Sequence, residues 1–152
     1  MKKASLAPWK SYQLDDSIPY LMNRITGMMN RQLELDLRAL GVSFQHWRIL
    51  AVLAQKNGSS ITDLSEYAVV PHSSLSRLLV RMESEGYVRR EMDLQDARTV
   101  RVYATSDGVD LYRKMVPMAV GIREHALTDL SAPQKDKLLE LLQQMLAQVQ
   151  AG

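Results

Sequence analysis

The chain has 152 residues, of which 46% are hydrophobic and 24% are charged, a composition that suits one folded globular domain and excludes a disordered chain. Lys and Arg number 19 against 17 Asp and Glu, so the net charge of +2 cannot by itself identify a nucleic-acid-binding protein, and any basic surface must be local. Because cysteine is absent, disulfides, thiolate metal sites and cysteine nucleophiles are excluded, and a reducing compartment is expected.

The N-terminal segment MKKASLAPWK is basic, but proline, tryptophan and lysine interrupt it before an apolar run of signal-peptide length can form. No later stretch approaches the roughly 20 apolar residues of a membrane helix. We therefore expect a cytoplasmic protein with no membrane segment.

Apolar residues recur at helical spacing over residues 16–40, which predicts a long first helix with Asp16 or Ser17 as its N-cap and Gly41 as its stop. A second helical pattern follows Ser43.

This second pattern carries Trp47 and Leu50 and ends near residues 57–58, where a polar turn follows. Residues 61–68 then form a short helix, for which Thr62 is a plausible N-cap.

Residues 72–85 form the most informative predicted helix, because four apolar side chains follow the i, i+3, i+4, i+7 rule and define one buried stripe. These are Leu75, Leu78, Leu79 and Met82. The outward face of the same helix carries two cations and three small hydroxyls: Ser73, Ser76, Arg77, Val80, Arg81 and Ser84. Gly86 is expected to end the helix, since glycine tolerates left-handed geometry.

Residues 87–92 and 99–105 are rich in β-forming side chains and are separated by an acidic turn, so they predict a hairpin, the only clear strand pair. The chain becomes helical again from Asp107 to about Leu127, with a kink or break expected at Pro117 and Gly121.

The last predicted helix begins with a capping box, Ser131 followed by Gln134. One apolar stripe runs along it, formed by Leu138, Leu141, Leu142, Met145 and Val149. The predicted fold is mainly α with a small β-hairpin wing (α+β), a winged helix-turn-helix with extra helices at both ends.

A short helix, a tight turn and a second helix with small polar and basic side chains have the geometry that enters the DNA major groove. Arg77 and Arg81 could instead merely solvate the back of a core helix. The adjoining hairpin favours DNA binding, because Arg98 at its tip could enter the narrow minor groove. We expect Asp96 to hold the guanidinium of Arg98 by a charge-assisted hydrogen bond; the alternative is an ordinary surface ion pair without function.

The segments SFQHWRILAVLA, ITDLSEYAVVPHSSLSRLLVRMESEGYVRRE and DLQDARTVRVYATSDG resemble the MarR family of winged-helix regulators. The most specific part is the wing, where the family usually has Asp-x-x-Asp-x-Arg and then a threonine that begins the next helix. Asp93, Asp96, Arg98 and Thr105 match this pattern. The sequence departs from it at two positions, with Ala97 where the family often has arginine and Ala104 where leucine is usual.

The resemblance implies a homodimer that straddles a palindromic operator in double-stranded DNA. Within a single domain over 1–152, it implies a DNA-binding lobe at 44–105 and dimerisation helices at 14–40 and 107–150. The far end of the last apolar stripe agrees, because a monomer of this size would struggle to cover Met145 and Val149. Packing of this stripe against the chain's own long helix is the alternative, and both can occur.

The candidate DNA-binding residues are Ser73, Ser74, Ser76, Arg77, Arg81, Asp96, Arg98 and Arg101. Those of the 72–85 helix suit the major groove, whereas Arg101, with Arg89 and Arg90, is expected to touch phosphates or solvent. His72 could meet a phosphate or could be an exposed bystander.

The resemblance also implies release of DNA by a small anionic aromatic molecule bound between the dimer helices and the lobe. Candidate effector residues are Tyr20, Arg24, Met28, His46 and Trp47. The alternative for Trp47 and Met28 is an ordinary core role. The opening YQLDDSIPYLMNRI is similar to a subgroup that controls breakdown of plant-derived aromatic acids and sometimes senses their coenzyme A thioesters.

Two other function classes are the alternatives to a DNA-binding regulator. His46, His72 and His125 are the only histidines, and no metalloprotease or serine-hydrolase motif accompanies them, so we expect no enzyme, no catalytic residue, no cofactor and no metal. A winged-helix module that binds proteins and not DNA is the other alternative. The outward pair Arg77 and Arg81 argues against it, since a protein interface usually presents aromatic anchors.

Overall fold

A computed structural model describes residues 13–152; the N-terminal segment judged above not to be a signal peptide lies outside the described residues. The elements in chain order are η1 (Leu14–Asp16), α2 (Ile18–Leu37), η2 (Arg38–Leu40), α3 (Phe44–Gln55), β1 (Ser59–Ser60), α4 (Ile61–Tyr67), α5 (His72–Ser84), β2 (Val88–Met92), β3 (Val100–Ala104), α6 (Ser106–Ala126) and α7 (Ala132–Ala151). The predicted class, mainly helical with a small β wing, is confirmed.

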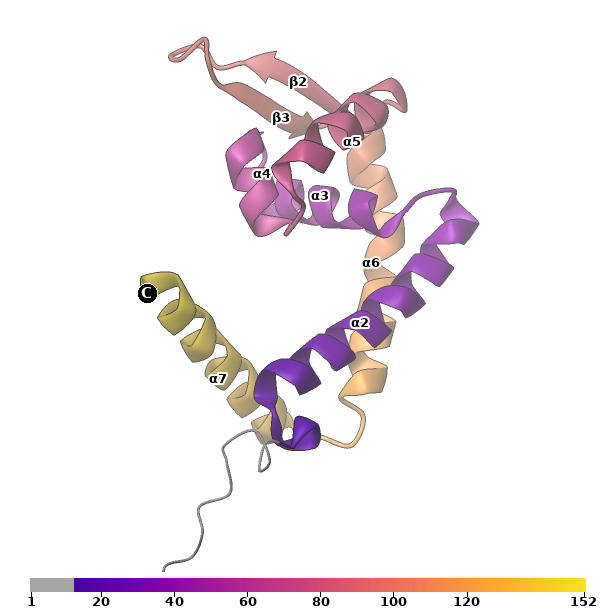
Figure 1. Ribbon diagram of the computed structural model, residues 1–152. Coiled ribbons are helices and arrows are strands. Elements are labelled where there is room, and N and C mark those ends of the chain that lie inside the picture. Colours follow the sequence, from indigo (N-terminus) through magenta and orange to yellow (C-terminus); the bar gives the residue numbers. More distant parts are fainter. Residues whose placement is uncertain (1–12) are drawn as a thin grey trace, which may run out of the picture.

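A lobe made of α3, α4, α5 and the strands sits at one end of the long helix α6, and α2 crosses α6 below it (Figure 1). Helix α7 follows the end of α6 that lies away from the lobe, extends as a separate arm, and buries none of its residues in the single chain. The chain is thus a lobe joined to an open frame of long helices.

The sheet is antiparallel with strand order β1-β3-β2. In the hairpin, Val88 pairs with Ala104 and Met92 pairs with Val100, as predicted for two short strands. The prediction of a single strand pair is incomplete, however, because Ser59 of β1 pairs with Val102 of β3. Two serines carry no alternating apolar pattern, so local sequence could not reveal this strand.

The core lies inside the lobe and reaches along α6. All four side chains of the predicted α5 stripe are buried, which confirms that α5 turns one apolar face inward. They pack in a cluster with residues from each neighbouring element, among them Leu37, Ile49, Leu64, Val102 and Met115. This packing fixes the outward direction of the opposite face of α5.

Side-chain caps lie at the starts of α4 and α7. Ser60, and not Thr62, is the N-cap of α4, because pairing of β1 with β3 holds Ser60 extended and its hydroxyl accepts from the amide of Asp63 at 3.1 Å. The predicted capping box of Ser131 and Gln134 is present at α7.

The predicted kink or break at Pro117 and Gly121 does not divide α6, which runs as one helix from Ser106 to Ala126. A proline removes one backbone hydrogen bond, but packing against α2 and α3 holds the helix together. The same helix starts unusually close to the wing, since a Cβ added to Gly108 would lie 2.1 Å from the carbonyl oxygen of Tyr87.

Candidate nucleic-acid interface and neighbouring pockets

The outward face of α5 is open to solvent. All six of its predicted residues are exposed, while Ser74 is half-buried. Within residues 13–152, the side chain of Arg77 makes no hydrogen bond or ion pair, so its charge is unbalanced. Such a cation, with small hydroxyl side chains beside it on the same helix face, can approach a phosphate or a base edge.

Arg81 is held in place at the other end of this face. Its Nε donates to Oε1 of Glu85 at 2.8 Å, and the other oxygen of Glu85 lies 2.8 Å from Nε2 of His46. Burial raises the pKa of Glu85, but hydrogen bonds from Arg81 and His46 outweigh that effect and lower the pKa overall. An ionised Glu85 therefore fixes Arg81 while the two terminal guanidinium nitrogens stay available.

His46 is buried inside the lobe and bonds to two of its elements. It is 1% exposed, and its Nδ1 lies 2.8 Å from the hydroxyl of Ser43, whose backbone amide it also caps. With both ring nitrogens occupied in this way, the predicted effector residue His46 connects the start of α3 to the end of α5 and lines none of the pockets described below.

The wing turn is ordered by its two aspartates. Asp93 Oδ2 accepts from Nε of Arg101, while Asp93 Oδ1 accepts from the backbone amides of Gln95 and Asp96 at 2.8 and 3.1 Å. The hydrogen bond from Arg101, with those from the two amides, holds the pKa of Asp93 below its usual range, and Asp93 raises the pKa of Arg101. The turn thus carries a fixed ion pair at its base.

The predicted contact between Asp96 and the guanidinium of Arg98 is wrong, since among residues 13–152 the Asp96 carboxylate has other partners. Asp96 accepts from the backbone amide of Arg98 at 3.0 Å and from the hydroxyl of Thr99 at 3.0 Å. An aspartate hydrogen-bonds readily to the backbone amide two residues on, and this local bond occupies the carboxylate. Asp96 therefore shapes the turn and leaves the guanidinium of Arg98 unpaired within the described chain.

The other ribbon arginines are engaged within the chain. Arg101 also donates to the carbonyl of Gly58 at 3.2 Å, Arg90 binds Glu83 through two nitrogens, and Arg89 lies over the ring of Tyr103. These three arginines were expected to contact phosphate or solvent, and the structure shows in addition that each has a partner within the chain.

A polar groove of about 470 Å³ runs between the start of α4 and the wing. Arg98 and Thr99 line it from the wing, and Thr62 and His72 line it from α4 and the first residue of α5. The structure therefore brings His72 and Arg98 to one groove, between the face of α5 and the wing tip.

Three of the other effector candidates, Arg24, Met28 and Trp47, are spread over three cavities, and Tyr20 lines none of these three. Met28 lines an apolar groove of about 840 Å³ between α2 and α6, and with Arg24 it lines a second groove of about 700 Å³ on α2. The guanidinium of Arg24 lies 5.7 Å from the ring centroid of Tyr20. Trp47 stacks on Tyr112 and lines the third cavity. In the single chain these residues do not share one pocket.

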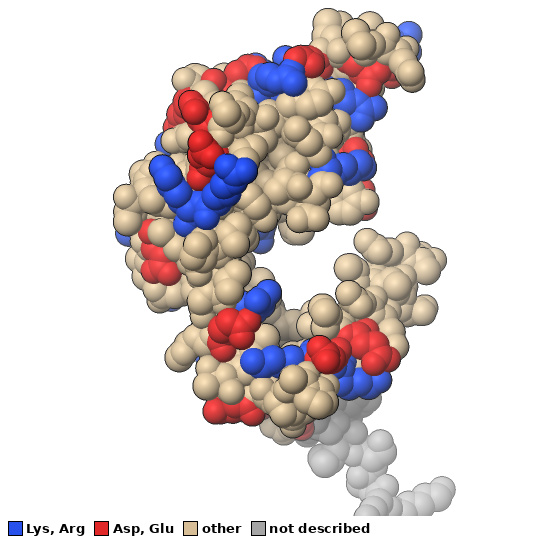
Figure 2. Space-filling view, turned by 180° about the vertical axis from the view of Figure 1, so that it is seen from behind, with Lys and Arg blue, Asp and Glu red and all other residues tan. Residues whose placement is uncertain are grey.

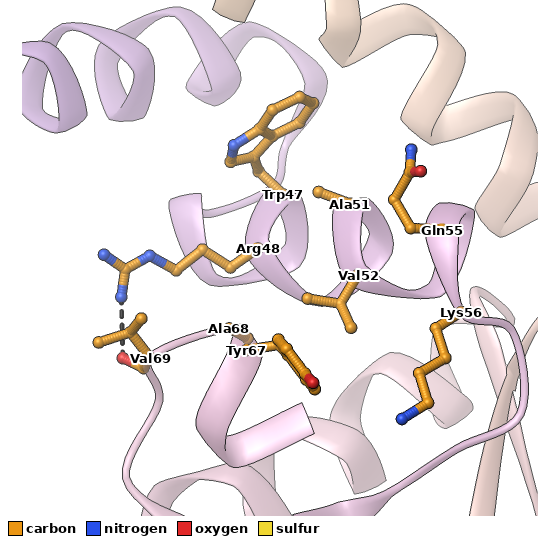
Figure 3. Close-up of a pocket in the computed structure, with 9 residues that line it drawn as sticks. All are labelled: Trp47, Arg48, Ala51, Val52, Gln55, Lys56, Tyr67, Ala68 and Val69. Atoms are coloured by element: carbon orange, nitrogen blue, oxygen red, sulfur yellow. Dashed lines mark hydrogen bonds between the residues drawn. The ribbon is translucent and has the colours of Figure 1, made fainter. Parts of the chain in front are cut away.

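The third cavity, of about 420 Å³, lies between α3 and α4 (Figure 3). The residues that line it, most of which sequence reasoning missed, are Trp47, Arg48, Ala51, Val52, Gln55, Lys56, Tyr67, Ala68 and Val69. Their spacing resembles that of ordinary helix positions, and only the fold brings α3 and the end of α4 together.

No helix among residues 13–152 is long and apolar enough to cross a membrane. The same residues contain no group of three or more His, Asp or Glu side chains that could hold a metal ion.

A helix-turn-helix whose second helix presents two exposed arginines, followed by a β-ribbon with an arginine at its tip, defines a winged-helix DNA-binding protein. The MarR family profile matches residues 40–99, which contain this lobe up to the wing tip. Transcriptional regulator HosA of Escherichia coli is 31% identical over 66% of this chain and 74% of its own. The chain belongs to the MarR family and is a DNA-binding transcriptional regulator.

Other relatives extend the likeness over more of the chain. The HTH-type transcriptional repressor IacR of Pseudomonas putida is 23% identical over 87% of this chain and 79% of its own. The crystal structure of a MarR family regulator from Silicibacter pomeroyi is 37% identical, covers 90% of this chain and 92% of its own, and superposes with a TM-score of 0.83. The fold also matches the MepR–DNA complex of Staphylococcus aureus, at 19% identity, 89% and 98% coverage and a TM-score of 0.75.

Proposed function

We propose that this regulator is a homodimeric repressor of a palindromic operator, and that a small aromatic acid or its coenzyme A thioester releases it from DNA. In this proposal α5 enters the major groove with Ser73, Ser76, Arg77 and Arg81, and the wing places Arg98 in the minor groove. Residues 44–105 act as the DNA-binding lobe, and the helices within 14–40 and 107–150 carry the dimer.

The observation that carries the DNA-binding part is which arginines of α5 and the ribbon have ion-pair partners. Arg77 and Arg98 are exposed and have no partner in the described chain, while Glu85 holds Arg81 by Nε alone. Arginines elsewhere on the ribbon are neutralised by Asp93, Glu83 or Glu91. Among the arginines of α5 and the ribbon, the two without a partner thus lie on α5 and at the wing tip, the elements that a winged helix inserts into DNA.

The dimer part rests on apolar side chains that the single chain leaves open. Along α7 the exposed large apolar side chains are Leu138, Leu139, Leu141, Leu142, Met145, Leu146 and Val149. Figure 2 places α7 across an open hollow from the lobe, with few charged side chains on the walls of the hollow. Ile18, Leu21, Met22 and Ile25 of α2 are exposed as well. Apolar surface of this extent is normally covered by a partner subunit.

The effector part is supported by the mixture of apolar walls and cations on α2 and α3. Arg24 beside Tyr20 offers a cation next to an aromatic ring, and Met28 offers an adaptable wall to both neighbouring grooves. Trp47 adds a second aromatic surface. A carboxylate attached to an aromatic ring fits this chemistry.

Selection of the purified protein against a random duplex library, followed by sequencing of the bound pool, tests the proposal. We expect a palindrome whose half-sites lie about one helical turn apart. Arg77→Ala and Arg98→Ala should weaken binding to that sequence, whereas Arg38→Ala, which removes an exposed arginine of η2, should not. If no motif emerged at low salt, the operator proposal would fail.

A further inference from the structure

One residue on the outward face of α5 has no role in the DNA contacts proposed above. Val80 is 52% exposed, and among the residues of α5, all of which the structure describes, it is the one apolar side chain that is exposed. The others, Leu75, Leu78, Leu79 and Met82, form the buried stripe. Val80 therefore lies outside the core that holds α5 in the lobe.

Val80 lies near the middle of the face that α5 turns away from the core. With about 100° of rotation per residue, its side chain is about 30° from the line directly opposite the buried stripe, and Arg77 is about 30° from that line on its other side. Ser76 and Ser84 lie one helical turn before and after Val80. With α5 in the major groove, this valine faces the edges of the bases.

The neighbouring side chains of the described chain do not cover Val80. Glu85 draws Arg81 toward the C-terminal end of α5, because Nε of Arg81 donates to the carboxylate of Glu85 at 2.8 Å. The hydroxyl of Ser84 donates to the carbonyl of Arg81 at 2.7 Å, which turns it back onto its own helix. The two methyl groups of Val80 thus form an open apolar spot between the two arginines of this face.

Valine is a poor choice for an exposed helix position with a purely structural role. Its β-branched side chain has a lower helix propensity than alanine or the straight-chain polar residues, and it adds no charge that could attract a phosphate. The same branching holds χ1 in one preferred rotamer, so little side-chain entropy is lost when a partner covers the methyl groups. Val80 is therefore suited to packing against an apolar group of the DNA.

We propose that Val80 reads a thymine, by packing its methyl groups against the C5-methyl of that base in the major groove. This inference rests on the proposed insertion of α5 into the operator. Thymine alone among the four bases carries a methyl group on its major-groove edge, and contact of a small apolar side chain with that methyl is a direct readout of sequence. Val80 thus distinguishes a T·A from a C·G pair at one position of each half-site.

Replacing thymine with uracil tests this contact, because uracil keeps the hydrogen-bonding groups of thymine and lacks only the methyl. The selected operator is synthesised with uracil at one thymine position at a time, in both half-sites. For the native protein we expect one position at which uracil weakens binding about fourfold per half-site, as for uncovering one buried methyl group. In Val80→Ala the same replacement should change the Kd less than about twofold. Equal losses for native protein and V80A at every position, or a selected half-site without thymine, would overturn the proposal.

The control variant is Val109→Ala, which removes the same two methyl groups from an exposed valine of α6. It should keep the native loss with uracil. V80A should fold normally, because Val80 is exposed and alanine favours the helix more than valine does; urea denaturation checks this.

A second DNA series restores the methyl on a different base. At the thymine position found above, a C·G pair should bind the native protein more weakly than T·A, and 5-methylcytosine should recover about fourfold per half-site. V80A should show no such recovery. Absence of recovery with the native protein would overturn the methyl contact. Operator binding by the native protein is measured first, so failure to bind any operator defeats the proposed function, whereas binding without a thymine that depends on Val80 defeats this inference alone.

Discussion

Replacing Thr105 with valine should destabilise the connection between the wing and α6. Its hydroxyl donates to the carbonyl of Gly86, which follows the C-cap of α5, and accepts from the amide of Gly108 in the first turn of α6. One hydroxyl therefore ties the end of the recognition helix to the start of α6. Valine has nearly the same shape but can make neither bond.

The cost follows from these two bonds. Loss of a threonine N-cap costs about 1 kcal/mol, and loss of a part-buried hydrogen bond to a carbonyl costs about 1 kcal/mol more. Thr105→Val should thus lower the free energy of unfolding by about 2 kcal/mol, measured by urea denaturation at one fixed protein concentration. Thr105→Ser keeps the hydroxyl and should lose much less. A loss under about 0.5 kcal/mol for the valine variant, or equal losses for both, would refute this reasoning.

Three further predictions concern an ion pair, a buried histidine and the role of α7 in the proposed dimer. Asp93→Asn should destabilise the protein at neutral pH, because it removes the ion pair with Arg101. The pKa of Asp93 is lowered in the folded protein, so the difference in unfolding free energy between native and variant should be constant above the ordinary aspartate pKa and shrink as the pH falls through the lowered pKa. A pH-independent difference in urea titrations would contradict this. His46→Phe should lower the free energy of unfolding by about 1–3 kcal/mol, because the His46 bond to Glu85 is lost, and an unchanged denaturation midpoint would refute it. Leu142→Glu should shift light scattering from dimer toward monomer, whereas a persistent dimer would exclude this part of α7 from the interface.

Sequence reasoning succeeded where a short-range pattern carries the physics. The four-residue apolar stripe of α5 fixed which side of that helix faces the core, and its spacing alone was sufficient for this. The acidic turn before an alternating strand predicted the hairpin, and Thr105 caps α6 as the family pattern implied. In each case the residues that carry the signal lie within a few positions of one another in the sequence.

Features that depend on contacts between distant segments could not be predicted from the sequence. Strand β1 exists because Ser59 meets Val102, 43 positions later along the chain, and neither residue announces the pairing. The hydrogen bond from Arg48 to the carbonyl of Val69 forms only where α3 meets the turn before α5, and only the packed lobe brings these segments together. The role of Asp96 was assigned to the wrong donor, because a nearby backbone amide competes with a flexible guanidinium for its carboxylate.

The central claim is that the outward face of α5 and the wing tip form the DNA-binding surface. The most direct measurement is the operator Kd of the native protein, Arg77→Ala and Arg98→Ala over a series of salt concentrations. Each phosphate contact contributes about 0.9 to the slope of log affinity against log salt, so we expect weaker binding for both variants and a shallower slope wherever the removed arginine neutralises a phosphate. Affinities and slopes equal to those of the native protein for both variants would contradict the account.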